Sequence, residues 1–357
     1  MAQKVAALSV EVSRTGYSAV SARSERNFQI LCKEWFDLFV APGLASCTEE
    51  HRRTMMNKHL FAEFGELEIK ELDTNRLQRF FNAKVKAELS ADYIGKMKNL
   101  LNNFFQYAVK QHNITENPMS DVVIRKRSTV SKKSGKALRP EIRETVLSAV
   151  MKNPVLAPII FTFTLTGLRP QELIALKWPE VNLESKTISV KQAVNRTRKF
   201  DSDGNVIEKG EEIGKTKTPK SVRTILMPDV AVDTLMDWRQ YCQDNNINSE
   251  FVFPCTETSR MRTYSGLRSM LERFKRSHNL QDENLSLYTF RHTFATILLE
   301  QRENPKIVAE LMGHTKVSTT LDMYSTVYNT VYEQTAQTLN SAFVKLTKKN
   351  PPNTDSI

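Results

Sequence analysis

Apolar residues recur at helical spacing along the first third of the chain. Four stretches carry Phe, Leu or Met on one side and polar residues on the other. Gly and Pro end regular helices, and Ser, Thr and Asp cap them. Such residues separate the four stretches: Pro42-Gly43, Gly65, Asp73 or Thr74, Ser90, and Asn117-Pro118. The pattern predicts a small four-helix bundle over residues 24–122.

From Leu138 onward the pattern changes between helices and short strands, which predicts a second domain of α+β type over residues 138–346. Prolines mark the helix starts, because the first helical position needs no N–H. The expected helices begin at Pro140, Pro154 and Pro170 and cover 229–242 and 262–278. The expected strands are 181–183, 187–190, 222–225 and 251–254, with a polar, exposed excursion over 196–214. The fold class is mainly α with a small β-sheet.

The stretch 287–324 reads as two short helices and a third segment that ends in a tyrosine. Asn304-Pro305 begins the second helix, and Gly313 fits its C-cap because glycine enters the left-handed region without strain. His314 is then presented just beyond a helix end. Ser318 is a candidate cap for the next turn, which carries Tyr324.

Length and charge narrow the class of protein. A chain of 357 residues with 40% hydrophobic content is expected to form two domains. Its formal charge of +11 favours a polyanionic partner, nucleic acid before a membrane. A basic protein without such a partner is the alternative.

Several classes find no support in the sequence. The four cysteines show no CxxC pairing and indicate reduced thiols in a cytoplasmic protein. Neither an apolar run of about 20 residues nor a signal-peptide core is present, so no membrane association is expected. Without a Walker-type glycine loop or carboxylates at metal-ligand spacing, we expect no cofactor and no metal.

Arg169 is the first candidate for binding an anion. It lies in a tight turn between Gly167, which caps one helix, and Pro170, which begins the next. A helix N-terminus offers free N–H groups, and an arginine adds a planar fork for two oxygens. Glu172, one turn further on, is placed to orient the guanidinium. A purely structural arginine at a helix cap is the alternative.

Arg291, His314 and Tyr324 are the remaining candidates. A cation, a neutral hydrogen-bond donor and a phenol suit phosphoryl transfer, whose transition state needs positioning and charge stabilisation. Each of them alone would be an ordinary surface or core residue. The three together indicate phosphoryl transfer much more specifically than any one of them does.

These residues stand in the segments T-G-L-R-P-Q-E-L, R-H-T-F-A-T, L-M-G-H and S-T-T-L-D-M-Y. The segments resemble the signature of the tyrosine recombinase, or phage-integrase, family, closest in style to integrases of phages and conjugative transposons. The resemblance implies a SAM-like helical core DNA-binding domain followed by the catalytic domain. It also implies a site-specific recombinase that integrates or excises a mobile element without ATP.

The resemblance assigns roles as well. Tyr324 is the nucleophile that forms a 3′-phosphotyrosyl link, Arg169 and Arg291 hold the phosphate, and His314 donates a hydrogen bond. In the family a lysine on a β-hairpin protonates the leaving oxygen. Lys217 matches that lysine best, with Lys215 and Lys220 as rivals.

One position departs from the family pattern. The usual H-x-x-R-H reads Tyr288-Thr-Phe-Arg291-His292 here. A phenol donates a hydrogen bond but is a poor base near pH 7. If the family's histidine only donates a hydrogen bond, Tyr288 replaces it. If that histidine accepts a proton from the nucleophile, Tyr288 slows the reaction. His292 lies on a different helix face by spacing.

Basic residues outside these segments are candidates for DNA contact. Lys96 lies on the polar side of the fourth helix, which is either a solvated face or a DNA-binding one. Arg125, Lys126 and Arg127 open a basic linker over 123–137, which either crosses the DNA or is a solubilising hinge.

The expected partner is double-stranded DNA with a specific recombination site, bound by a homotetramer on two duplexes. The resemblance also allows an accessory DNA-bending or directionality factor. The protein would then be bacterial or phage-encoded and nucleoid-associated. Residues 331–346 form a candidate protomer contact, and 1–23 and 347–357 read as a mobile and a disordered tail. Two rival functions stay open: a non-catalytic DNA-binding relative, and a type IB topoisomerase-like enzyme.

Overall fold

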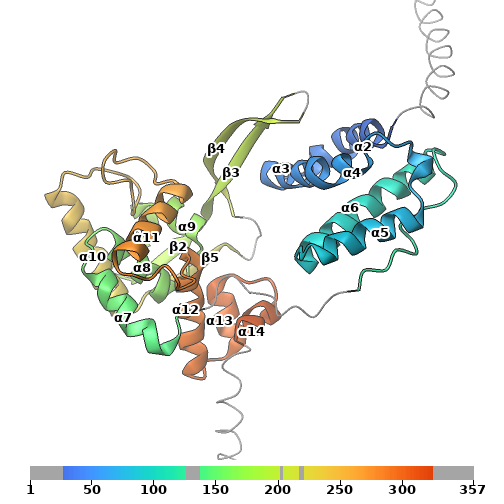
Figure 1. Ribbon diagram of the computed structural model, residues 1–357. Helices are drawn as coiled ribbons and strands as arrows, with labels where there is room; N and C mark the ends of the chain where they lie inside the picture. The colour runs from blue at the N-terminus through green and yellow to red at the C-terminus, as the bar shows by residue number, and fades with distance from the viewer. Residues whose placement is uncertain (1–26, 126–136, 202–203, 217–220, 325–357) are drawn as a thin grey trace, which may run out of the picture. The chain divides into compact units, whose positions relative to one another are not determined.

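The computed structural model describes residues 27–125, 137–201, 204–216 and 221–324, with side chains up to residue 321 (Figure 1). The chain divides into two compact units. The first comprises residues 1–132 together with 196–210, and the second comprises 133–195 together with 211–357. The segment 196–210 therefore belongs to the unit formed by the N-terminal helices, which the sequence did not predict.

The first unit is built from helices around one apolar core. Its helical elements are α2 (Phe28–Trp35), η1 (Phe36–Val40), η2 (Ala41–Gly43), α3 (Ser46–Met55), η3 (Met56–Phe61), α4 (Ala62–Phe64), η4 (Ile69–Glu71), α5 (Thr74–Lys86) and α6 (Ala91–Lys110). Because α3, η3 and α4 are continuous, they form one long helical segment, so the four predicted helices are present. Side-chain oxygens of Asp73 and Ser90 cap α5 and α6, as their sequence positions predicted.

Aromatic side chains fill the centre of this bundle. The Phe28 ring meets the ring of Phe104 edge to face at 5.3 Å between centroids, and Phe81 and Phe105 are also fully buried. The buried side of α6 consists of residues spaced three and four apart, which is why this helix carries the longest stripe of the core.

The second unit combines helices with a small sheet. Its helices are α7 (Pro140–Met151), α8 (Leu156–Thr166), α9 (Pro170–Ala175), η5 (Trp178–Glu180), α10 (Asp229–Asp244), α11 (Tyr264–Ser277), α12 (Leu287–Glu300), α13 (Pro305–Met312) and α14 (Val317–Tyr324). Its strands are β1 (Val181–Asn182), β2 (Thr187–Val190) and β5 (Arg223–Leu226), in the antiparallel order β1-β2-β5. The almost wholly apolar α8 is buried between α7, α10 and α12 (Figure 1).

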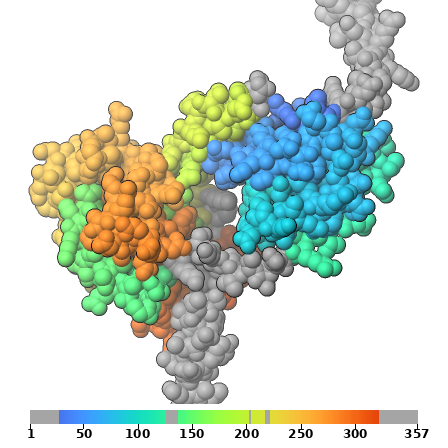
Figure 2. Space-filling model, viewed as in Figure 1, coloured from blue at the N-terminus to red at the C-terminus, as the bar shows by residue number. Residues whose placement is uncertain are grey.

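The polar stretch 196–214 is not an irregular excursion. It lies within a two-stranded sheet of β3 (Gln192–Phe200) and β4 (Val206–Lys215). Its distal part packs on α3: the Arg198 N–H donates to Ser46 Oγ at 3.1 Å, and Arg198 Nε pairs with Glu50 at 2.6 Å. Figure 2 shows the yellow-green atoms of this sheet against the blue atoms of the first helices.

Three further expectations need correction. The helix expected from Pro154 begins at Leu156, and the Asn153 side chain accepts hydrogen bonds from the backbone N–H groups of Val155 and Leu156 at its start. Residues 251–254 form only a single bridge, between Phe251 and Lys177, although the segment is buried. The helix expected over 262–278 begins at Tyr264, so Arg262 lies before it, and Arg262 is buried with its guanidinium bonded to the Pro254 carbonyl.

The C-terminal stretch 287–324 folds as three helices that position the candidate site. The Asn304 side chain caps α13, and Gly313 ends it with a left-handed φ of 65°, as the sequence predicted. The expectation that Ser318 caps the next helix is wrong, because α14 already begins at Val317. The backbone of Tyr324 closes α14, and its side chain lies outside the described residues.

Candidate active site

The C-terminus of α13 is surrounded by three arginine side chains. The N–H groups of Gly313 and His314 donate to the carbonyls of Glu310 and Ala309, which is a Schellman ending. The next three carbonyls each accept from a different arginine. Arg223 Nε donates to Leu311 at 2.6 Å, Arg291 Nη2 to Met312 at 2.5 Å, and Arg169 Nη2 to Gly313 at 2.6 Å.

These arginines come from three separate elements. Arg169 is the N-cap of α9, Arg223 is the first residue of β5, and Arg291 lies in α12. Arg291 also donates to the Gly167 carbonyl at the end of α8. Gly313 is required here for a second reason besides its φ: an added Cβ would lie 3.1 Å from Arg223 Nη1 and 3.2 Å from Arg169 Nη1.

Glu172 is the one carboxylate bonded to this cluster among the described residues. Its side chain is 2% exposed, and it accepts from Arg169 Nη1 at 2.6 Å and from both terminal nitrogens of Arg223 at 3.0–3.1 Å. Burial alone would raise the pKa of Glu172, but the hydrogen bonds and charges of Arg223 and Arg169 outweigh it and lower the pKa. Glu172 therefore stays ionised and orients Arg169, as predicted.

Three cationic groups share one carboxylate, so the cluster carries an excess of positive charge. Arg291 is 2% exposed, and burial followed by repulsion from Arg169 lowers its pKa to about 9, which leaves it a cation at neutral pH. Buried cations without carboxylate partners are costly, and a bound anion relieves that cost. Arg169, with a side chain 26% exposed, is the most solvent-accessible of the three arginines.

His314 is neutral in this environment. Burial and the nearby charges of Arg291 and Arg169 lower its pKa to about 3. The Arg291 guanidinium, which can only donate, lies 3.2 Å from Nε2, so the proton is on Nδ1, which donates to Thr320 Oγ1 at 2.8 Å. Thr320 is fully buried in α14 and thereby connects the imidazole to the helix that ends at Tyr324.

Tyr288 lies beside the cluster. Its hydroxyl donates to Gln171 Oε1 at 3.2 Å, and burial raises its pKa. Its ring faces His292 with 6.2 Å between centroids. Burial, and then the charge of Arg291, lowers the pKa of His292 to about 4, and its Nδ1 is buried without a hydrogen-bond partner among the described residues.

The structure thus brings together Arg169, Glu172, Arg291 and His314, with Tyr288 and His292 beside them. Lys217, Lys220, Lys126 and Arg127 lie outside the described residues, whereas Lys215 is exposed at the end of β4. Lys96 and Arg125 belong to the first unit and are exposed, and Lys96 pairs with Asp92 at 2.7 Å.

Sequence reasoning missed Arg223 and Thr320. The side chain of Arg223 is only 8% exposed. Its Nε and both terminal nitrogens donate to protein acceptors, so Arg223 positions its neighbours. Its signal was the S-x-R-T-I segment after the candidate lysines. Thr320 had only the S-T-T segment as a signal, which gives no reason to prefer one hydroxyl over another.

Within the described parts of the chain, no three His, Cys, Asp or Glu side chains are grouped as a metal ion would require. No helix in those parts combines the length and the apolar character needed to cross a membrane.

Fold and site together define a class: a helical unit joined to an α+β unit whose cationic cluster lies beside a helix ending in tyrosine. Residues 136–330, more than half of the chain, match the model of the phage integrase family. The chain belongs to this family and is a tyrosine recombinase.

Individual relatives agree with this assignment. A tyrosine recombinase XerC-like protein of Caldanaerobacter subterraneus subsp. tengcongensis is 26% identical over 308 residues, covering 82% of this chain and 76% of the relative. The structure of the Tn1549 transposon integrase in complex with a circular intermediate DNA has a TM-score of 0.67 at 21% identity, and the match covers 84% of this chain and 95% of that integrase chain. The structure of a lambda integrase tetramer bound to a Holliday junction has a TM-score of 0.59 at 13% identity, and the match covers 84% of this chain and 80% of the lambda integrase chain. The two structures show that the fold is shared.

Proposed function

We propose that this recombinase cuts and rejoins duplex DNA at a specific site through a 3′-phosphotyrosyl link at Tyr324, and that it integrates or excises a mobile element. The observation that carries the proposal is the convergence of Arg169, Arg291 and neutral His314 with one carboxylate between them. Such a cluster suits a phosphodiester, whose negative charge grows in the transition state. The DNA-bound integrases of Tn1549 and lambda support DNA as the substrate.

In this mechanism the Tyr324 oxygen attacks phosphorus and the bond to the 5′ oxygen breaks. Arg169 and Arg291 hold the two non-bridging oxygens and offset their charge. Lys217, or its rival Lys215 or Lys220, gives the departing 5′ oxygen a proton, and the phenolic proton passes to solvent. The 5′-hydroxyl of a partner strand then reverses these steps, so the phosphodiester energy is kept without ATP.

His314 donates a hydrogen bond to the same phosphate only if Nε2 carries the proton. Its present tautomer has the proton on Nδ1, with Nε2 accepting from Arg291. When a phosphate binds Arg291, the Arg291 guanidinium no longer donates to Nε2 of His314. Thr320, whose hydroxyl both donates and accepts, then donates to Nδ1 and leaves Nε2–H for the phosphate. The Thr320 contact therefore supports either tautomer.

The assembly proposed is a homotetramer on two duplexes, supported by the tetrameric form of lambda integrase. Because the substrate is element and chromosome DNA, the protein acts in the bacterial cytoplasm, and an accessory DNA-bending or directionality factor is part of the proposal. The basic residues Arg125, Lys126 and Arg127 remain proposed phosphate contacts.

The test uses duplexes selected by binding from a randomised library, each nicked at successive positions so that cleavage traps the protein. Wild-type protein should form a covalent adduct visible on a denaturing gel. Tyr324→Phe should bind the same duplexes without any adduct. Absence of an adduct with wild-type protein that still binds would indicate a non-catalytic relative. Relaxation of plasmids that lack the selected sequence would indicate a topoisomerase.

A further inference from the structure

A hydrogen-bonded pair stands beside the arginine cluster, formed by Tyr288 of α12 and Gln171 of α9. The Tyr288 hydroxyl donates to Gln171 Oε1 at 3.2 Å, and both side chains are half-buried. Gln171 comes two residues after Arg169, and Tyr288 comes three residues before Arg291. The pair therefore joins the segment that carries one phosphate-binding arginine to the helix that carries the other.

The charges of both arginines act on Tyr288. Burial is the largest influence on the pKa of its hydroxyl and raises it, as Tyr264 also does, whereas Arg291 and Arg169 act in the opposite direction. Interactions between charges weaken with distance, so the pair lies close to the guanidinium groups that would hold a phosphate. Because the net pKa is raised from an ordinary value near 10, the hydroxyl keeps its proton at neutral pH.

The direction of this hydrogen bond decides which group can donate to a phosphate. A tyrosine hydroxyl has one proton, and in Tyr288 that proton is directed at Gln171 Oε1. The Tyr288 oxygen then has only lone pairs left, which a negatively charged phosphate oxygen repels. The Gln171 amide instead carries two N–H donors on Nε2. Gln171 is therefore the member of the pair that can donate to a phosphate.

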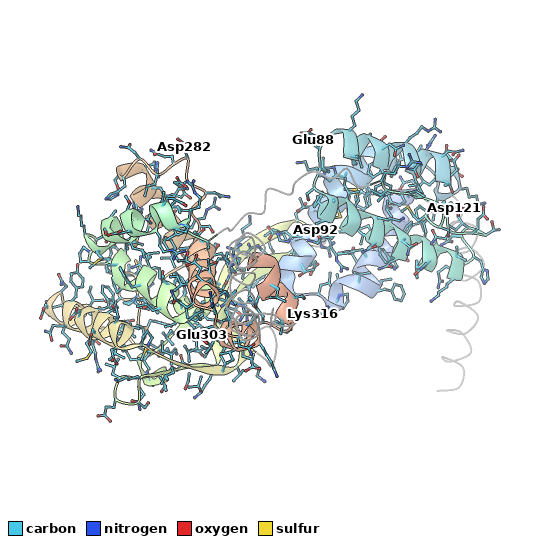
Figure 3. All side chains as sticks on the ribbon, turned by 90° about the horizontal axis from the view of Figure 1, so that it is seen from below. Glu88, Asp92, Asp121, Asp282, Glu303 and Lys316 are labelled. Carbon is cyan, nitrogen blue, oxygen red and sulfur yellow. The ribbon has the colours of Figure 1, made fainter. Side chains whose placement is uncertain are left out.

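The amide donors of Gln171 are free within the part of the chain that the structure describes. Nε2 has no hydrogen-bond partner there, and because it is not buried it is accessible to a ligand. Glu172, the next residue, is bonded to arginines instead. Asp282 and Glu303, labelled in Figure 3, lie before and after α12 and are exposed, and neither bonds to Gln171. No described carboxylate thus competes with a phosphate oxygen for this donor.

We propose that Gln171 is a further catalytic residue, whose amide donates a hydrogen bond to a non-bridging oxygen of the scissile phosphate. Tyr288 is its positioning residue, because the hydroxyl holds Oε1 and so fixes the direction of Nε2. The amide thereby supplies the hydrogen bond that the family pattern would take from a histidine at position 288. This inference rests on the proposed function, since it needs a phosphodiester at the cluster.

The test is single-turnover adduct formation on the nicked duplexes selected for the proposed function. Gln171→Ala and Gln171→Met both remove the donor, and methionine keeps the length of the side chain and a high helix propensity. Both should slow adduct formation about 10- to 100-fold, the usual effect of losing a hydrogen bond to a charged group. Tyr288→Phe should slow it less. Adding Tyr288→Phe to Gln171→Ala should cause no further loss, because Tyr288 acts through the amide.

A sulfur substitution distinguishes contact with the phosphate from a structural role. Each non-bridging oxygen of the scissile phosphate is replaced in turn by sulfur, a weaker hydrogen-bond acceptor, which gives two stereoisomers. Sulfur at the oxygen that Gln171 contacts should slow Gln171→Ala less than it slows wild-type protein. Sulfur at the other oxygen should slow both proteins equally. If both stereoisomers slow the variant as much as wild-type protein, Gln171 does not contact the phosphate and this inference is overturned.

Gln240→Ala is the matched control. It removes an exposed amide of α10, which is bonded to Asp244 at 2.8 Å, and should leave adduct formation unchanged. If Gln171→Ala and Gln171→Met react as fast as wild-type protein, this inference is overturned and the proposed function stands. Loss of the folded circular dichroism signal in both would assign Gln171 to the fold and overturn it as well. If wild-type protein forms no adduct on any nicked duplex, the proposed function fails, and this inference fails with it.

Discussion

Tyr288 occupies the position where the family pattern has a histidine, and its surroundings make it a fixed neutral group. Burial raises its pKa, and its hydroxyl is directed at Gln171. The two nearby imidazoles are also uncharged at neutral pH, because burial and Arg291 lower the pKa of His292 to about 4 and of His314 to about 3. None of these three groups changes its charge between pH 5 and pH 8.

A first prediction concerns Tyr288→His. The new imidazole has an ordinary pKa near 6.5, which burial and Arg291 would lower as they lower that of His292. Its neutral, proton-accepting form then appears as pH rises through a value below 6.5, so adduct formation in the variant should rise with pH at values below about 6.5 and be constant above. Wild-type protein should show no such rise, measured as single-turnover adduct formation from pH 5 to 8.

Tyr288→Phe is the matched control. It removes the hydroxyl but adds no titrating group, so its pH profile should keep the wild-type shape. Its rate should fall about 10- to 100-fold if the hydroxyl bonds the phosphate, the usual effect of losing a hydrogen bond to a charged group. A phenylalanine variant as fast as wild type would show that the hydroxyl has no part in the reaction.

At this scale the sequence predicted those residues whose local signals are strong. Arg169 stands between a C-capping glycine and a helix-starting proline, and His314 follows a C-capping glycine. Arg223 was not predicted, because its partners Glu172 and Leu311 lie far away in the chain. Thr320 was not predicted although its partner His314 is only six residues away, because the S-T-T segment does not show which hydroxyl makes the contact. Spacing within a helix or strand carries no information about such contacts.

At the scale of elements, α13 is the part on which the site depends. The Schellman ending satisfies two of its carbonyls, and α9, β5 and α12 each send an arginine to one of the next three. The helix C-terminus carries partial negative charge, which favours cations there. One helix end therefore sets the position of Arg169 and Arg291 relative to His314.

A second prediction tests this arrangement through Arg223→Ala. The change leaves the buried Glu172 with Arg169 as its sole cationic partner in the cluster and removes the donor to the Leu311 carbonyl. Breaking one side of a buried ion pair costs about 3–5 kcal/mol. The second unit should therefore unfold at lower denaturant concentration, followed by circular dichroism, and adduct formation should be lost.

Arg139→Ala provides the comparison. Arg139 pairs with Glu283 at 2.8 Å, but its side chain is 62% exposed, so the loss should stay below about 1 kcal/mol. Equal destabilisation by the two variants would contradict the role assigned to Arg223.

Element boundaries could be predicted where caps are strong, as at Asn304, Gly313 and Ser90. The sheet of β3 and β4 could not, because its residues are largely polar and show neither period clearly. Arg198 of β3 pairs with Glu50 within the first unit, whereas Val194 at the start of β3 is buried in the core of the second unit. The helix α14 was predicted, but taking Ser318 as its cap placed its first residue at 319, two residues after its observed start at Val317.

At the scale of the whole molecule, the chain joins its two units through more than the linker. Residues 196–210 belong to the first unit, while residues 192–195 of β3 and 211–215 of β4 belong to the second. On the first unit, Arg53 lies over the rings of Phe36 and Phe200 at 5.0 and 5.4 Å and pairs with Asp37 at 2.7 Å. In the second unit, Glu211 accepts from the Tyr264 N–H at 3.0 Å.

The last prediction tests whether the Arg198 contact holds residues 196–210 of this sheet on α3. Arg198 and Glu50 form a pair with side chains 12% and 21% exposed, whereas Lys199 and Glu208, on the same sheet, are 70% and 59% exposed. Arg198→Ala removes a charged hydrogen bond of the docked part, so amides of 196–210 should exchange with deuterium on the order of tenfold faster. Lys199→Ala should leave that exchange nearly unchanged, because exposed pairs contribute little. Deuterium uptake of residues 196–210 is measured by mass spectrometry on the full chain of both variants. Equal exchange rates in the two would mean that the sheet holds its position without the Arg198 contact, and that α3 is only its neighbour.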